Sequence, residues 1–104
     1  MYMETCIKDR LRLVKVDVLS LLHVLSVSDS IALELEEISS STHTSESDLK
    51  GIIGTLRRMK FNEESIIQPS GRDQKGRIRW QINKNVVDKN ELAIFLEQEI
   101  FGDI

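Results

Sequence analysis

The sequence predicts a mainly α-helical domain that carries one small β-hairpin, which is an α+β fold. Apolar residues recur at steps of three and four in three segments before residue 60 and again near the C-terminus, as on one face of a helix. From Ser65 to Ile82 the period changes to two, the alternation typical of half-buried strands. With 104 residues, 40% hydrophobic and 30% charged, the chain fits one globular domain over 1–104.

Two helices are expected in the first 40 residues. The first covers residues 5–27, and its apolar face consists of Ile7, Leu11, Val14, Val18, Leu21 and Leu25. Ser28-Asp29-Ser30 then interrupts the pattern and supplies an N-cap for a short second helix over residues 31–39. On this second helix Ile31, Leu35 and Ile38 are expected to point inward, and Glu34, Glu36 and Glu37 to point to solvent.

A third helix is expected over residues 45–60, after a polar turn. Seven of the nine residues 39–47 carry a hydroxyl group, and such side chains favour turns and caps because they compete for backbone hydrogen bonds. Ser45 and Asp48 resemble a capping box at the start of the helix, and Phe61-Asn62 is expected to end it. Its buried stripe consists of Leu49, Ile52, Ile53, Leu56 and Met59.

A β-hairpin and a closing helix complete the chain. The first strand begins at residues 66–68, and Pro69 confines it to an edge or a strand end. A turn-rich, charged loop over 70–76 leads to a second strand over 77–82, in which Ile78, Trp80 and Ile82 share one face. Asp88 caps a helix over 88–101, whose stripe is Leu92, Phe95, Leu96 and Ile100.

Positive charge gathers in the middle third of an acidic chain. The net charge is −3, but residues 50–84 hold nine Lys and Arg against three Asp and Glu. Residues 1–49 hold four against nine, and residues 85–104 hold one against five. Long-range attraction depends on the local field more than on the total, so an anionic partner is expected to meet the middle third.

No catalytic or metal-binding pattern stands out, so we expect a protein that is not an enzyme and has no cofactor. Cys6, His23 and His43 lack metal-ligand spacing, and the serines form no nucleophile motif. The single cysteine suits a reducing compartment, and the sequence shows no signal peptide and no stretch that spans a membrane. A cytoplasmic protein is the expectation.

The order of these elements resembles the winged helix-turn-helix superfamily over residues 8–84. The strongest part of the match is 45–82: a capped helix ending in Leu56-Arg57-Arg58-Met59-Lys60, then a hairpin that contains Gly76-Arg77-Ile78-Arg79-Trp80. The resemblance implies a DNA-binding protein, with a transcriptional regulator as the leading function.

In such modules the third helix enters the major groove and the wing lies along the phosphates. The resemblance therefore places one set of residues of the third helix toward the groove: Ser45, Ser47, Lys50, Gly51 and Gly54. It places Arg57 and Arg58 at the DNA backbone, and it makes four basic residues the phosphate contacts of the wing: Arg72, Lys75, Arg77 and Arg79.

Several features leave alternatives open. The third helix has no Asn or Gln to read base edges, and the acidic second helix would repel phosphate, so a winged-helix protein–protein interaction module is the second hypothesis. Gly51 and Gly54 fit either a close approach of DNA or a tight crossing against a neighbouring helix. Trp80 fits a core position better than a surface that stacks on a base.

A homodimer joined through the terminal helices is a further expectation. The closing helix carries more apolar surface than a lid needs, since Phe101 and Ile104 extend its stripe. Leu13 and Val16 lie outside the main stripe of the first helix as well. The alternative is that the closing helix folds back on the first helix and completes a monomeric core.

Overall fold

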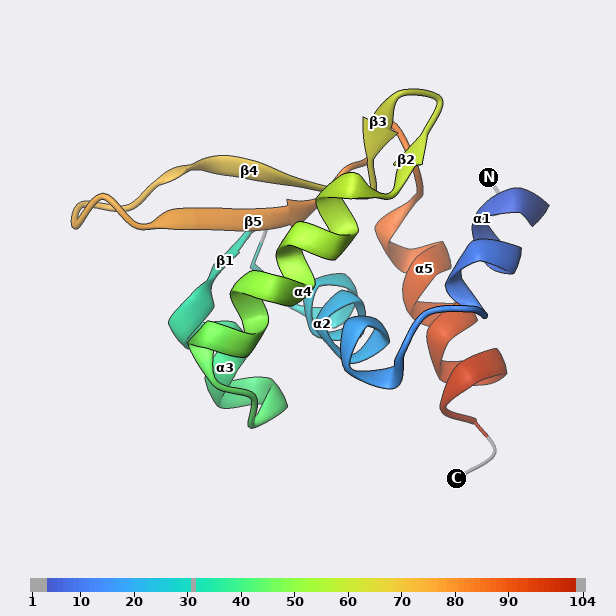
Figure 1. Ribbon diagram of the computed structural model, residues 1–104, viewed down its shortest axis with the longest axis horizontal. Coiled ribbons are helices and arrows are strands. Elements are labelled where there is room, and N and C mark those ends of the chain that lie inside the picture. The colour runs from blue at the N-terminus through green and yellow to red at the C-terminus, as the bar shows by residue number, and fades with distance from the viewer. Residues whose placement is uncertain (1–3, 31, 103–104) are drawn as a thin grey trace.

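The computed structural model describes residues 4–30 and 32–102 and shows helices packed around a small antiparallel sheet (Figure 1). The helices are α1 (Thr5–Leu11), α2 (Val16–Val27), α3 (Leu35–Thr42), α4 (Glu46–Arg58) and α5 (Lys89–Phe95), which continues as the π-helical segment η1 (Leu96–Ile100). The strands are β1 (Leu33–Glu34), β2 (Lys60–Phe61), β3 (Glu64–Ser65), β4 (Ile67–Arg72) and β5 (Ile78–Ile82). The prediction of an α+β fold is confirmed.

The main sheet has the strand order β1-β5-β4 with antiparallel pairing throughout. Leu33 pairs with Trp80 and Ile67 with Ile82, and a bulge interrupts the ladder between Pro69 and Arg72. Pro69 therefore lies on an edge strand, as predicted. The β4–β5 hairpin extends well beyond the helices, so its tip stands free of the core (Figure 1).

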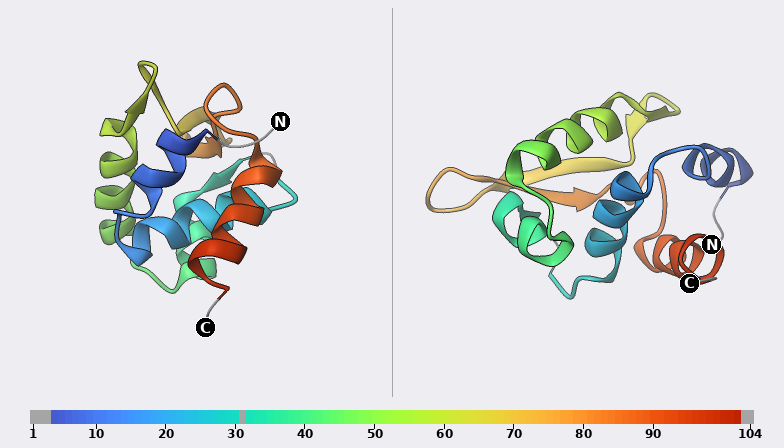
Figure 2. Two further views of the ribbon diagram at one scale, coloured as in Figure 1. Left: turned by 90° about the vertical axis from the view of Figure 1, so that its right-hand side faces the viewer. Right: turned by 60° about the horizontal axis from the view of Figure 1, so that its bottom comes forward.

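The hydrophobic core lies between the sheet and helices α2, α4 and α5. Helix α2 passes through its centre, where Leu21 and Leu22 are fully buried (Figure 2). The predicted stripe of α4 is buried as expected, and so are Trp80 and Ile82 of β5. Alternation thus identified the inner face of β5 correctly, because a strand exposes successive side chains to opposite sides.

The first helix was predicted as one element over 5–27, and this prediction is wrong. The chain forms two helices, with a turn after Leu11 and an extended Lys15 before Val16. The break lets α1 change direction and lie beside α5, where Ile7 and Leu11 are buried and Arg12 pairs with Glu99 (Figure 2). A straight helix rises about 1.5 Å per residue and would carry Ile7 away from this core.

The second helix begins later than predicted, at Leu35 rather than residue 31. Leu33 and Glu34 are extended because they pair with Trp80 and Arg79 of β5. The helix also runs on to Thr42, and His43 ends it in the left-handed conformation at φ 57°. At this C-terminal end of α3, a hydroxyl of the serine-rich segment bonds to the helix backbone: Thr42 Oγ1 donates a hydrogen bond to the Ile38 carbonyl at 2.9 Å.

Helix α4 starts where the sequence predicted it and ends earlier. Ser45 Oγ accepts a hydrogen bond from the Asp48 amide at 3.2 Å, so the predicted N-cap is confirmed. The helix ends at Arg58 because Lys60 and Phe61 pair with Ser65 and Glu64 in a second, small hairpin. Asn62 and Glu63 form its turn with positive φ.

The closing helix folds back onto the rest of the chain. Asp88 caps α5 by accepting from the Glu91 amide at 3.0 Å, and Leu92, Phe95 and Leu96 are buried. This part of the stripe therefore belongs to the core of a single chain, as in the monomeric alternative. Ile31, Ile104 and the side chain of Ile100 lie outside the described residues. Within residues 4–30 and 32–102, no helix is long and apolar enough to cross a membrane.

Candidate nucleic-acid interface

The outer face of α4 displays the residues that the resemblance assigned to DNA. Its buried stripe turns Leu49, Ile53 and Leu56 to the core, which leaves the opposite face of the helix open. Gly54 is half-buried, and the other assigned residues of this segment are exposed: Ser45, Ser47, Lys50, Gly51, Arg57 and Arg58. The apolar spacing of α4 alone therefore sufficed to predict which side chains are accessible.

Two grooves flank the N-terminal half of α4. The first, of about 420 Å³, separates α4 from the hairpin, with Lys50 on one wall and Arg72 and Arg77 on the other. The second, of about 730 Å³, lies on the other side of the helix, between Gly51 and the segment that joins α1 to α2. This half of the helix therefore stands out as a ridge between two hollows.

The two glycines of α4 face open space. A Cβ built on Gly51 would meet nothing within 4 Å, and one on Gly54 would meet only the end of the Arg58 side chain, at 3.3 Å. No neighbouring helix crosses closely at either position in the described structure, so the tight-crossing interpretation is wrong. Glycine in a helix costs about 0.5–1 kcal/mol relative to alanine, and the fold of this chain gives no compensating contact.

The C-terminal half of α4 carries positive charge. The Arg57 guanidinium lies 5.6 Å from the centre of the Trp80 ring, a cation–π distance. Trp80 is only 7% exposed, so its predicted core position is confirmed and its ring is not offered to a base. The first turn of α4 is acidic instead, with Glu46 and Asp48.

A tight turn, which Asp73 organises, forms the hairpin tip. Asp73 Oδ1 accepts hydrogen bonds from the amides of Lys75 at 2.8 Å and Arg77 at 2.9 Å, and Gly76 has φ 80°. The Arg72 guanidinium donates to the Gly76 carbonyl at 2.6 Å. All four basic residues assigned to the wing are exposed: Arg72, Lys75, Arg77 and Arg79.

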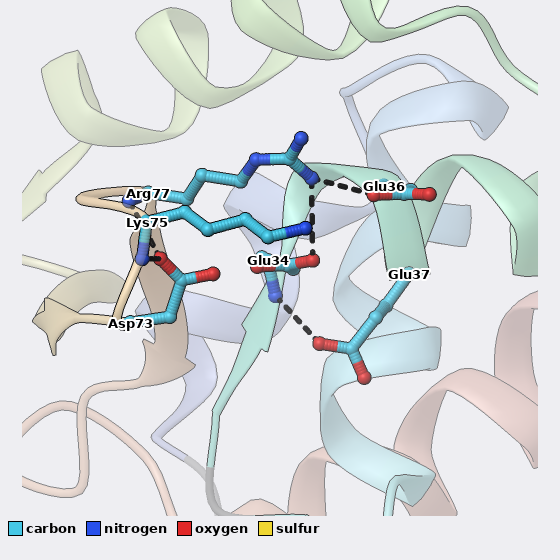
Figure 3. Close-up of polar contacts among 6 residues, drawn as sticks. All are labelled: Glu34, Glu36, Glu37, Asp73, Lys75 and Arg77. Carbon is cyan, nitrogen blue, oxygen red and sulfur yellow. Dashed lines mark hydrogen bonds and ion pairs between the residues drawn. The ribbon is translucent and has the colours of Figure 1, made fainter.

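Arg77 differs from the other three because it binds the acidic helix. Its guanidinium lies 2.5 Å from Glu36 Oε2 and 3.6 Å from Glu34 Oε1, so the hairpin and α3 are joined by an ion pair (Figure 3). The hydrogen bond to Glu36 and the charges of both carboxylates raise the pKa of Arg77 above its ordinary value. These glutamates were predicted to point to solvent, and the sequence gives no sign of the ion pair because 41 residues separate Arg77 from Glu36.

The carboxyl groups of Glu34 and Asp73 are also coupled across this contact. A hydrogen bond to Asp73, burial and the negative charge of Asp73 raise the pKa of Glu34. Backbone amide donation from Arg77, then the hydrogen bond with Glu34, lowers the pKa of Asp73. Each carboxyl group therefore shifts the pKa of the other, in opposite directions.

A second arginine also bridges two carboxylates, because Arg12 pairs with Asp9 and Glu99 at the far side of the molecule from the hairpin tip. His23 lies at the rim of the core, where Nε2 is 3.1 Å from Glu97 Oε1 and the ring packs on Phe101. His43 is exposed, as expected. In the part of the chain that the structure describes, no group of three His, Cys, Asp or Glu side chains is arranged to hold a metal ion.

Comparisons of this chain with protein-family models, with curated proteins and with solved structures found no match.

Proposed function

We propose that this protein is a winged helix-turn-helix protein that binds double-stranded DNA, with transcriptional regulation as its role. Helix α4 enters the major groove, and the β4–β5 hairpin is the wing that lies along the phosphates. The observation that carries the proposal is the ridge formed by α4 between two grooves, with the basic hairpin beside one of them.

The dimensions of this ridge suit the major groove of DNA. A helix with its side chains is about 10–12 Å across, and the major groove is about 12 Å wide. A helix that stands out from the surface can enter the groove, while the hollows on either side leave room for the two backbone strands. Gly51 lies on the exposed face, where the missing side chain allows closer approach to a base edge.

The distribution of charge indicates how the helix would lie. The acidic first turn of α4 disfavours phosphate there, whereas Arg57, Arg58 and the wing favour it. Base edges would therefore meet Ser47, Lys50 and Gly51, and phosphates would meet the C-terminal half of α4 and the hairpin. With one long donor near the start of the helix, base reading is weak, and affinity depends mainly on phosphate contacts.

One observation favours the alternative, a winged-helix protein–protein interaction module. Arg77, which the resemblance assigned to phosphate, is paired with Glu36 and Glu34. A wing with this arrangement presents charges of both signs, as a protein partner with mixed charge would require. The same binding experiment separates the two functions.

The test is the salt dependence of DNA binding, measured by fluorescence anisotropy on a mixed-sequence duplex. We compare the parent with the double variant Lys75→Ala/Arg79→Ala, whose side chains are exposed and lie outside the core. Each lost phosphate contact reduces the magnitude of the slope of log K against log salt by about 0.9. The slope of the double variant is therefore expected to be about 1.8 smaller in magnitude than that of the parent.

The matched control is Lys8→Ala/Lys84→Ala, which removes the same charge from α1 and from the segment after β5. The control should keep the slope of the parent. A slope that is equal in all three proteins rules out the wing as a DNA contact. Absence of binding even at about 50 mM salt, where phosphate contacts are strongest, would leave the interaction module as the function.

A further inference from the structure

The ion pair between the hairpin and α3 places acidic groups where a phosphate would approach. Three cations meet three carboxylates there: Lys75, Arg77 and Arg79 face Glu34, Glu36 and Asp73. Figure 3 shows that Lys75 and Arg77 both extend from the hairpin tip toward α3, and that Glu36 lies at the end of the Arg77 guanidinium. The charges of this cluster therefore cancel, although the hairpin by itself is basic.

The ion pair between Arg77 and Glu36 is exposed to solvent, so another anion can replace the carboxylate. The side chains of Arg77 and Glu36 are 48% and 63% exposed, whereas that of Glu34 is 16% exposed. Exposed ion pairs contribute little to stability because water and salt screen them. A phosphate of a DNA strand can compete for the same guanidinium, since phosphate also accepts paired hydrogen bonds from arginine.

Binding of a phosphate to Arg77 costs free energy that a wing without these ion pairs would not require. When a phosphate takes Arg77, Glu36 and Glu34 lose their partner and remain within a few ångströms of the incoming charge. At such distances salt screens the repulsion only in part, since the Debye length is about 8 Å at 0.15 M. The carboxylates then also attract cations, which offsets the counterions that the DNA releases.

From this geometry we propose that Glu34 and Glu36 form an acidic latch that holds Arg77 on α3 and restrains DNA binding by the wing. The inference rests on the proposed function. In the free protein Arg77 lines the groove beside α4 but is already paired with carboxylates, and on binding a DNA phosphate replaces them. The latch weakens non-specific binding most, because such binding depends almost entirely on phosphate contacts.

The test compares the parent with Glu34→Gln/Glu36→Gln, which keeps the shape of both side chains and removes their charge. At the strength typical of surface ion pairs, loss of the contacts to Glu34 and Glu36 corresponds to a rise in affinity of about 2- to 20-fold for a duplex of random sequence. The log–log salt slope should steepen by up to about 0.9, because Arg77 then contributes one net phosphate contact. A role limited to stability would leave that slope unchanged.

The control is Glu63→Gln/Glu91→Gln, which removes two charges from the β2–β3 turn and from α5. At about 150 mM salt these distant charges are screened, and the control should bind within twofold of the parent. A second readout without DNA is the ¹⁵N relaxation of residues 73–77, where opening the latch should increase motion of the tip.

The outcomes distinguish the latch from the proposed function. If the parent binds DNA and the Gln variant matches the control, the latch is overturned and DNA binding stands. Weaker binding by the Gln variant also overturns it, because the contact then positions the wing for DNA. If none of the proteins binds at about 50 mM salt, the proposed function fails and the latch fails with it, whatever the tip relaxation shows. Binding by the Gln variant alone would support both.

Discussion

At the scale of single residues, Trp80 shows how the core and the candidate interface meet. Its indole lies on the inner face of β5 and is 7% exposed, while Arg57 of α4 covers the ring from the outside. The same side chain therefore fills the core and supports the helix that we propose to enter DNA. Ile78, two residues earlier on the same face, is half-buried because it lies nearer the free end of the hairpin.

Replacement of Trp80 by alanine should strongly destabilise the protein. Large-to-small changes of buried aromatic residues cost about 3–5 kcal/mol, through lost burial and the cavity that remains. Arg79→Ala, on the opposite face of the same strand, should change the free energy of unfolding by no more than about 0.5 kcal/mol. Urea denaturation measures both, and equal effects for the two variants would contradict the assigned faces of β5.

Glu34 and Asp73 should titrate on opposite sides of the ordinary range. We expect the pKa of Glu34 above the ordinary value of a glutamate and that of Asp73 below the ordinary value of an aspartate. Because the pKa of Glu34 is raised, its contribution to stability is complete below its ordinary value and is lost as the pH rises through the raised one. The lowered pKa of Asp73 has the opposite effect. Asp73 stabilises the folded protein fully above the ordinary pKa of an aspartate, and this stabilisation is lost as the pH falls through the lowered pKa.

Carboxyl ¹³C chemical shifts recorded against pH measure both groups. In Asp73→Asn the amide oxygen can still accept from the turn amides, but the charge is gone. The pKa of Glu34 should then fall toward its ordinary value, since Asp73 is the main cause of the shift. An unchanged titration of Glu34 in this variant would show that the two groups are not coupled.

At the scale of elements, α4 is defined by its buried side, and the fold sets few requirements on its outer side. Glycine at position 51 weakens the helix without a contact that explains it. Gly51→Ala should therefore stabilise the protein by about 0.5–1 kcal/mol, because alanine restricts the unfolded chain and its Cβ meets open space. Thermal and urea unfolding test this, and a loss of stability would mean that the position is not open.

Helices with long apolar stripes and strands with clean alternation could be predicted from the sequence, as α4, β5 and α5 show. Two of the features that were missed depend on contacts between distant residues. β1 exists because Leu33 and Glu34 pair with β5, and the break before α2 exists because α1 packs beside α5. The periodic pattern runs unbroken through Leu11, Val14 and Val18, so it conceals that break.

The candidate site also combines features that local sequence patterns predict with a contact between distant residues that they do not. The exposed face of α4 and the basic hairpin followed from local patterns, because burial of one face determines the other. The pairing of Arg77 with Glu36 did not, because nothing in either segment indicates its partner. Asp73 could have been recognised from Asp73-x-x-Gly76, since Asp and Gly are favoured in tight turns.

At the scale of the whole molecule, α5 packs into the core of its own chain. Leu92, Phe95 and Leu96 lie in its core, so this part of the stripe is not free to join two copies. The homodimer stays a prediction, and on α5 it would have to use Ile94, which is 49% exposed. The tip of the basic hairpin lies at the opposite end of the molecule from α5 and η1, which carry Glu91, Glu97 and Glu99 (Figure 1).

The most direct test of DNA binding through α4 and the wing is an amide NMR titration of the protein with a short duplex. We expect shift changes concentrated in residues 45–58 and 72–79, with α5 and η1 nearly unaffected, and a decrease in these changes as salt is added. Changes confined to α5 and η1, or no change at about 50 mM salt, would contradict this expectation.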